Sequence, residues 1–233
     1  MKHAVKYFYF FIPLFSFAQH SKIDSLRSLL KNDAEDVYKV DHLNKLSHQY
    51  INIGSFDSAL TYGYKALTVA NLLHNEDVHS GFSDSYNNIG LVYLYQGNYP
   101  KTLEYFLKAL KINEERQDRV GVVKCLGNIG LVYYNQKDYS KALNYYLKAL
   151  KVLECFEDMQ LQENNLGNIG LVYSAQGDYS KAIEYYLKAL KMAEKIKDKS
   201  GIAKILSNIG SVYYDQSDYS KAIDYDLKAL KLD

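Results

Sequence analysis

The sequence predicts an all-α protein built from helical hairpins that stack in series. Three observations lead to this fold class: a forty-residue internal repeat, apolar residues at helical spacing within each repeat, and very few helix breakers. Only two prolines, Pro13 and Pro100, occur in 233 residues. Because proline interrupts the interior of a helix, so small a number favours helix along most of the chain.

The first eighteen residues are typical of an export signal rather than of folded structure. Lys2 and Lys6 form a positively charged start, and residues 7–17 are apolar over a length typical of a signal sequence. Ser16 and Ala18 place small residues before a predicted cleavage at Gln19. We therefore expect a signal peptide over residues 1–18 and a periplasmic mature protein. The alternatives are an uncleaved membrane anchor and a buried strand; lipid attachment at the cleavage site is not expected, since no cysteine follows it.

A forty-residue period organises the rest of the chain. The tripeptide Asn-Ile-Gly begins at residues 88, 128, 168 and 208. Residues 128–151 and 168–191 are identical at 19 of 24 aligned positions. Such units cannot bury their apolar faces alone, so we expect each to pack on the next.

Each repeat carries two helical segments joined by a short polar turn. In the third repeat the predicted helices cover about 121–136 and 139–156, with the turn at residues 136–138. The second helix has an apolar stripe at i, i+3, i+4 and i+7: Leu143, Tyr146, Leu147 and Leu150. Asp138 ends the turn, where its carboxylate can accept hydrogen bonds from the free N–H groups of the second helix.

These positions resemble the tetratricopeptide repeat (TPR) family over roughly residues 34–233. That family combines a glycine and a following aromatic residue in helix A with alanine, an aromatic residue and alanine in helix B. The matching glycines are Gly90, Gly130, Gly170 and Gly210, the aromatics Tyr93, Tyr133, Tyr173 and Tyr213, and the first helix B alanines Ala142, Ala182 and Ala222. Thr102, Asp226 and Gly63 depart from the pattern in the second, fifth and first repeats.

The resemblance implies a right-handed superhelical solenoid of about five hairpins. The expected segments are a leading helix within 19–33, a divergent first repeat at 34–80, regular repeats at 81–120, 121–160 and 161–200, and a short last repeat at 201–233. The glycine lets a neighbouring helix approach closely, and the aromatic fills the space beside it.

The resemblance also implies that the A helices line a concave groove that binds a protein or peptide. The residue two before each glycine forms a row of carboxamides, Asn88, Asn128, Asn168 and Asn208. Such a row can bind an extended backbone, or alternatively fix the packing of the helices. More variable groove positions are Lys124, Lys204, Tyr134 and Tyr214; for the lysines, simple solvation is the alternative. The lysines of helix B, such as Lys148 and Lys188, are predicted to form a solvated outer face.

No pattern in the sequence indicates catalysis, so we expect no enzyme and no cofactor. There is no phosphate-binding loop, no dinucleotide-binding motif and no zinc-protease motif. The 28 basic and 27 acidic residues nearly balance, which does not favour nucleic acid or an anionic membrane surface as a partner. A metal site at His74, Glu76, Asp77 and His79 is less favoured than a chance cluster in a loop. Whether Cys125 and Cys155 form a disulfide stays open.

Two functional hypotheses follow. The first is an exported scaffold that binds a protein or peptide in its groove. The second is the extracytoplasmic sensor region of a longer signalling protein, because exported TPR arrays resemble the input regions of certain sensor histidine kinases and regulators. The short final helix and its Asp226 are compatible with a chain cut within its last hairpin or with a polar end cap. The partner and the oligomeric state are not indicated by the sequence.

Overall fold

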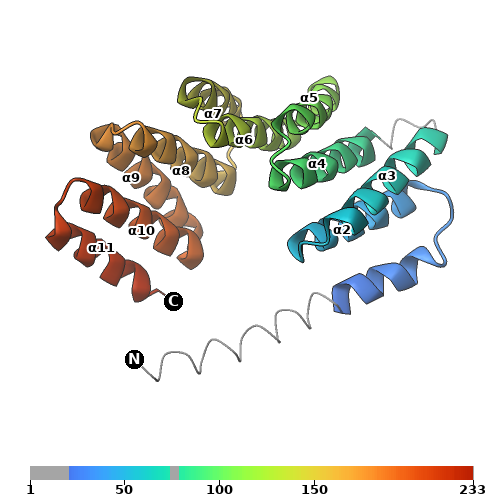
Figure 1. The fold of residues 1–233 in the computed structure, drawn as a ribbon, viewed down its shortest axis with the longest axis horizontal. Helices are drawn as coiled ribbons and strands as arrows, with labels where there is room; N and C mark the ends of the chain where they lie inside the picture. The colour runs from blue at the N-terminus through green and yellow to red at the C-terminus, as the bar shows by residue number, and fades with distance from the viewer. Residues whose placement is uncertain (1–20, 74–78, 233) are drawn as a thin grey trace. The chain divides into compact units, whose positions relative to one another are not determined.

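The computed structural model describes residues 21–73 and 79–232, all of whose regular elements are helices (Figure 1). The chain divides into two compact units, residues 1–117 and residues 118–233. The predicted all-α fold of helical hairpins is confirmed for the described residues. The predicted signal peptide and most of the 74–79 cluster lie outside them.

The first unit contains a short leading helix and two hairpins. The leading helix covers residues 21–30. The hairpins are formed by α2 (Val37–Asn52) with α3 (Phe56–Leu73), and by α4 (His79–Tyr95) with α5 (Tyr99–Glu115). Helix α4 packs against both α2 and α3, so the second hairpin covers the apolar face of the first. Leu46, Ala59 and Val92 are fully buried in this core.

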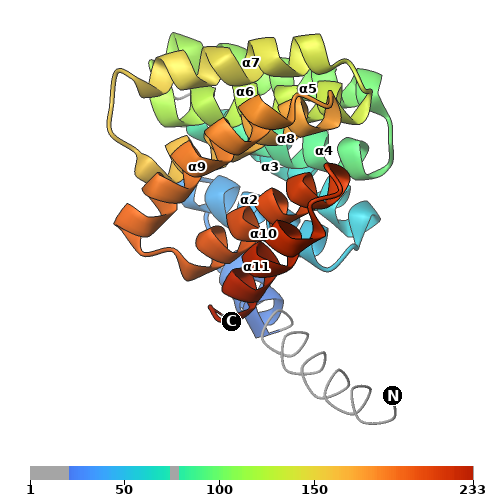
Figure 2. The same ribbon diagram turned by 90° about the vertical axis from the view of Figure 1, so that its left-hand side faces the viewer.

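The second unit contains three hairpins that pack one after another. They are α6 (Arg119–Asn135) with α7 (Tyr139–Leu153), α8 (Met159–Ala175) with α9 (Tyr179–Ile196), and α10 (Lys199–Asp215) with α11 (Tyr219–Leu230). Helices α10 and α11 run side by side in both views (Figure 1, Figure 2). Helix α8 contacts α6 and α7, and α10 contacts α8 and α9. Within this unit, helices α8 and α10 therefore each pack against both helices of the hairpin before them.

The helices of the third repeat differ slightly from the sequence-based ranges. Helix A begins two residues earlier than expected, at Arg119, because Asp118 caps it by accepting a hydrogen bond from Gly121 N at 2.9 Å. Helix B ends at Leu153 rather than near residue 156. Asp138 caps helix B as predicted, with its Oδ1 3.1 Å from Lys141 N.

The turn between the two helices of the second to fifth hairpins contains one residue in the left-handed backbone region. Gly97 and Gly177 adopt it with φ of 71° and 78°, and Lys137 and Ser217 adopt it with φ of 60° and 63°. Glycine has no Cβ to disfavour this conformation, whereas lysine and serine adopt it at a steric cost.

A glycine of helix A lies directly against an aromatic ring of helix B in the regular hairpins. A Cβ built on Gly130 would lie 2.7 Å from the Tyr146 ring, and one on Gly170 would lie 2.8 Å from the Tyr186 ring. Both rings are about 1% exposed, and the alanines Ala142 and Ala182 beside them are fully buried. The glycine is therefore required by a close approach between the two helices of one hairpin.

Among the described residues, none of the helices is both long and apolar enough to span a lipid bilayer.

Candidate functional site

A groove between two A helices of the second unit brings together three of the predicted binding residues. It lies between α6 and α8 and has a volume of about 150 Å³. Its lining residues are Val123, Lys124, Gly127, Asn128, Leu131, Leu161, Asn164, Asn165 and Asn168. Lys124, Asn128 and Asn168 are thus neighbours in space although the two asparagines are a full repeat apart.

The asparagines of this groove fall into two groups. Asn165 is buried, and its Nδ2 donates to the backbone oxygen of Tyr146 at 2.9 Å. Asn164 Nδ2 donates to Gln160 O within its own helix at 2.9 Å. Over the described ranges, the half-buried amides of Asn128 and Asn168 have no hydrogen-bond partner. These two carboxamides are therefore available to a ligand.

Gly127 leaves the middle of this groove open. A Cβ built there would meet no atom within 4 Å, in contrast to Gly130 one turn later. Val123, Leu131 and Leu161 contribute apolar surface on either side of the asparagines. The groove therefore combines apolar contacts with carboxamides that can donate and accept hydrogen bonds.

The corresponding groove of the first unit lies between α2 and α4 and measures about 290 Å³. Its lining residues are Asp41, Asn44, Lys45, His48, Gln49, Asp84, Asn87 and Asn88. Asn88 is buried here, and its Nδ2 donates to the backbone oxygen of Asn44 at 2.9 Å. Asn44 in turn donates to Gly81 O at 2.9 Å and accepts from Ser85 Oγ at 2.7 Å.

The predicted row of asparagines therefore has mixed roles. Asn88 fixes α4 on α2, which is the packing role that the sequence left open as an alternative. Asn208 on α10 is half-buried like Asn128 and Asn168. Lys204 lies in a separate depression of about 400 Å³ together with Asp226 and Leu230.

Tyr134 and Tyr214 lie against the start of the following helix B rather than along the two grooves. The Tyr134 ring is tilted against Tyr139 with centroids 5.8 Å apart, and the Tyr214 ring meets the edge of Tyr219 at 5.4 Å. Burial raises the pKa of Tyr134, with a further contribution from Tyr139. The side chain four residues after the glycine of helix A therefore lies near the hairpin turn.

Glu163 is a buried carboxyl group that the sequence did not single out. It occupies the place that Val123 and Ala203 take in the neighbouring repeats, and it accepts a hydrogen bond from Gln160 Nε2 at 2.6 Å. Burial raises the pKa of Glu163, and the nearby Asp198 raises it further. The only signal in the sequence was an acidic residue at an otherwise apolar or small position of the repeat.

A family model described as tetratricopeptide repeat matches residues 82–154 and 161–233. The chain belongs to the tetratricopeptide repeat family. None of the curated proteins compared with this TPR sequence matches it significantly.

Solved structures share the fold at low sequence identity. BtubC from P. vanneervenii is 21% identical with a TM-score of 0.74, covering 92% of this chain and 88% of that one. A Rap protein complexed with competence and sporulation factor is 17% identical with a TM-score of 0.70, covering 97% and 74%. The apo form of the quorum sensor NprR from B. thuringiensis is 18% identical with a TM-score of 0.72, covering 96% and 62%. These similarities establish the TPR architecture.

The two cysteines are not joined by a disulfide. Cys125 is buried in α6, and Cys155 is exposed just after α7. In the described parts of the TPR chain, no group of three or more histidine, cysteine or acidic side chains is arranged to hold a metal ion.

Proposed function

We propose that this chain is an exported TPR scaffold that binds an extended segment of another protein along its A helices. The observation that carries the proposal is a pair of carboxamides, Asn128 and Asn168, that share one groove between α6 and α8 and have no hydrogen-bond partner among the described residues. Each carboxamide offers both a donor and an acceptor, which matches the alternating groups of an extended backbone.

The size of the groove favours a peptide over a compact small molecule. Its volume of about 150 Å³ is below the range of roughly 300–1,000 Å³ usual for small-molecule pockets. A single side chain fits such a space while the backbone continues along the helices. Lys124 at its edge is exposed and attracts an acidic residue of the ligand.

Two of the similar structures support binding as the general role. One is a Rap protein in complex with a factor, and another is a quorum sensor. The exported location is proposed from Lys2, Lys6 and the apolar residues 7–17. Recovery of the protein in the periplasmic fraction with Gln19 at its N-terminus tests this part, and recovery in the cytoplasm with Met1 intact contradicts it.

The groove is tested by replacing the two available carboxamides together. A peptide selected from a random displayed library on the unmodified protein serves as the probe, and its Kd is measured by fluorescence anisotropy. Asn128→Ala with Asn168→Ala is expected to weaken binding by about tenfold or more, since each lost hydrogen bond weakens it severalfold. The free energy of unfolding should stay within about 1 kcal/mol, because neither amide forms a hydrogen bond with any residue that the structure describes.

The matched control is Asn135→Ala with Asn144→Ala, two exposed asparagines of α6 and α7 outside the groove. This variant should bind the peptide like the unmodified protein. Equal Kd values for the groove variant and the control would refute the groove. A large loss of stability in the groove variant would instead assign a packing role to these asparagines.

The alternative function is the sensor region of a longer signalling protein. The similarity to a quorum sensor is the observation that favours it. The coding sequence beyond residue 233 distinguishes the two: a membrane-spanning segment followed by a kinase core supports the sensor, and an immediate stop supports the scaffold.

A further inference from the structure

The first unit contains a larger depression that is separate from the groove between its A helices. It lies between the leading helix, α2 and α3, and its volume is about 440 Å³. Its lining residues are Arg27, Leu30, Lys31, Glu35, Lys39, Leu43, Tyr62, Lys65, Thr68 and Val69. This volume lies within the range of small-molecule pockets, unlike that of the α6–α8 groove.

The floor of this depression is apolar. Leu43 and Val69 are 4% and 8% exposed, and Leu30 and Tyr62 pack against the same apolar clusters. A ligand that reached this floor would remove its own apolar surface from water, which favours binding.

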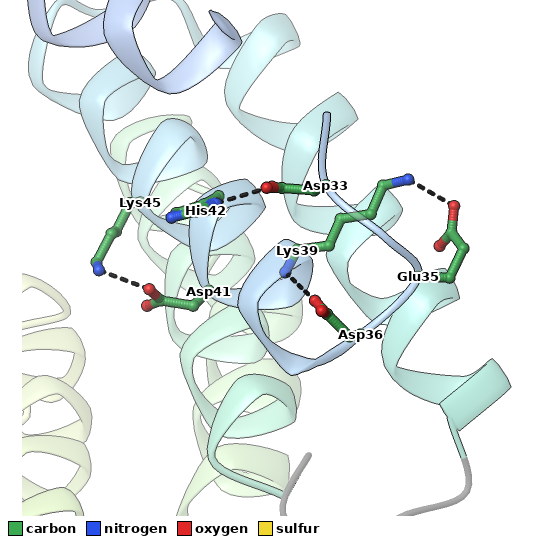
Figure 3. A network of polar contacts seen from close by, with 7 residues as sticks. All are labelled: Asp33, Glu35, Asp36, Lys39, Asp41, His42 and Lys45. Atoms are coloured by element: carbon green, nitrogen blue, oxygen red, sulfur yellow. Dashed lines mark hydrogen bonds and ion pairs between the residues drawn. The ribbon is translucent and has the colours of Figure 1, made fainter. Parts of the chain in front are cut away.

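The walls are strongly cationic in a chain whose net charge is close to zero. Four basic side chains line the depression with a single carboxylate, that of Glu35. Glu35 forms an ion pair with Lys39 (Figure 3). Asp33 and Asp36, which also lie nearby, are engaged by the His42 ring and by the backbone N–H of Lys39 (Figure 3).

Three cations remain without a carboxylate partner within the part of the chain that the structure describes: Arg27, Lys31 and Lys65. Two of them are held in place by aromatic rings. The Arg27 guanidinium lies 5.7 Å from the centre of the Tyr50 ring, and Lys65 Nζ lies 5.3 Å from that of Tyr62. Held cations lose less side-chain entropy on binding an anion than free ones do.

Arg27 is specific to this hairpin. In every other hairpin a lysine near the start of helix B covers the equivalent tyrosine of helix A, as Lys141 covers Tyr133 at 5.2 Å. The first hairpin has Ser58 at that position, and the leading helix supplies Arg27 to the ring of Tyr50 instead. Guanidinium offers a planar fork of donors that suits carboxylates better than ammonium does.

We propose that this depression binds a small organic anion with an apolar body, such as a medium-chain or aromatic carboxylate. The carboxylate would lie among Arg27, Lys31 and Lys65, and the apolar body would lie on Leu43 and Val69. This site is independent of the peptide groove proposed above, because it lies on different helices and uses charge rather than carboxamides.

The test uses octanoate as the probe in calorimetric titrations of the purified chain. We expect one molecule of octanoate to bind per chain, with the methyl resonances of Leu43 and Val69 shifting in NMR spectra. Octan-1-ol, which lacks the charge, and inorganic sulfate, which lacks the apolar body, should each bind at least about tenfold more weakly. Equal binding of either one would overturn the proposal.

The test variant is Lys31→Gln with Lys65→Gln, which removes two of the cations while leaving the apolar floor intact. It should raise the Kd for octanoate by about tenfold or more. The matched control is Lys148→Gln with Lys151→Gln, which removes two exposed lysines of α7. Lys148 Nζ lies 5.1 Å from the centre of the Tyr145 ring, and Lys65 Nζ lies at a similar 5.3 Å from that of Tyr62. An unchanged Kd in the test variant, or an equal loss in the control, would overturn the proposal, as would the absence of octanoate binding.

Discussion

The hairpins α8–α9 and α10–α11 share one architecture but differ in what lies against the central glycine. In α8–α9, the ring of Tyr186 lies on Gly170 and is about 1% exposed. In α10–α11, Asp226 takes the place of the tyrosine, with its Oδ1 2.6 Å from a Cβ built on Gly210, and it is exposed.

This difference shows that the glycine and the aromatic residue have separate structural roles. The glycine allows the two helices of one hairpin to approach, so both hairpins keep it. The aromatic ring belongs to a shared core: Tyr186 packs in one cluster with Ile205 and Ile209 of the next helix A. A carboxylate is tolerated at position 226 because it reaches solvent, and the same group at position 186 would be buried among apolar side chains.

The largest expected change in stability comes from replacing Tyr186 with alanine, and the same replacement at Asp226 is the comparison. Tyr186→Ala should lower the free energy of unfolding by about 3–5 kcal/mol, because it leaves a cavity between α9 and α10. Asp226→Ala should change it by less than about 0.5 kcal/mol, since the side chain is exposed. Urea unfolding followed by circular dichroism measures both. Similar losses in the two variants would contradict the assignment of the ring to a shared core.

The two glycines give a smaller contrast of the same kind. Gly170→Leu should cost about 1–3 kcal/mol, because the new side chain meets the enclosed Tyr186 ring. Gly210→Leu meets the end of an exposed Asp226 side chain that can rotate away, and leucine improves helix propensity. We therefore expect a change below about 1 kcal/mol at residue 210. A larger loss at 210 than at 170 in the same urea experiment would mean that contact with the helix B backbone, not the ring, demands the glycine.

Most of the fold was predictable because its signals are local and repeated. The apolar stripe of helix B, the capping Asp138 and the glycine of each helix A depend on residues only a few positions apart. Each of these patterns then recurs at the same position in successive repeats, which makes it easier to recognise. The helix ends were less accurate: Asp118 caps helix A of the third repeat outside the expected range.

The candidate site was predictable only in part, because its roles depend on neighbours in space. Asn88 and Asn128 occupy the same repeat position, yet Asn88 bonds to the Asn44 backbone and Asn128 has no such partner in the described structure. Tyr134 was expected along the groove and lies against Tyr139 instead. The Arg27 that covers Tyr50 comes from outside the repeats, where no periodic signal exists.

The smallest expected change in the free energy of unfolding concerns Glu163. This residue lies where α8 meets the start of α10, away from the Tyr186 core that also joins these two hairpins. Glu163 faces Asp198 across this joint, with Gln160 donating to it and Lys204 near enough to lower its pKa partly. Burial and Asp198 outweigh these groups, so the pKa of Glu163 is raised in the folded state. The protonated form is therefore the one that folding favours.

The pH dependence follows from that direction. A carboxyl group whose pKa is raised on folding contributes full stability below its unfolded pKa of about 4.3, and this contribution is lost as the pH rises through the folded pKa.

Glu163→Gln keeps a neutral side chain at every pH, so it should be more stable than the unmodified protein at pH 7, by less than about 1 kcal/mol. The gap should close toward pH 4, whereas Tyr186→Ala should lose the same free energy at both pH values because tyrosine stays protonated between pH 4 and 7. Urea unfolding of the three proteins between pH 4 and 7 measures this. A difference in the free energy of unfolding that stays constant with pH would show that nearby groups stabilise the Glu163 carboxylate as well as water does. The contact of α8 with α10 would then be as insensitive to charge as the core around Tyr186.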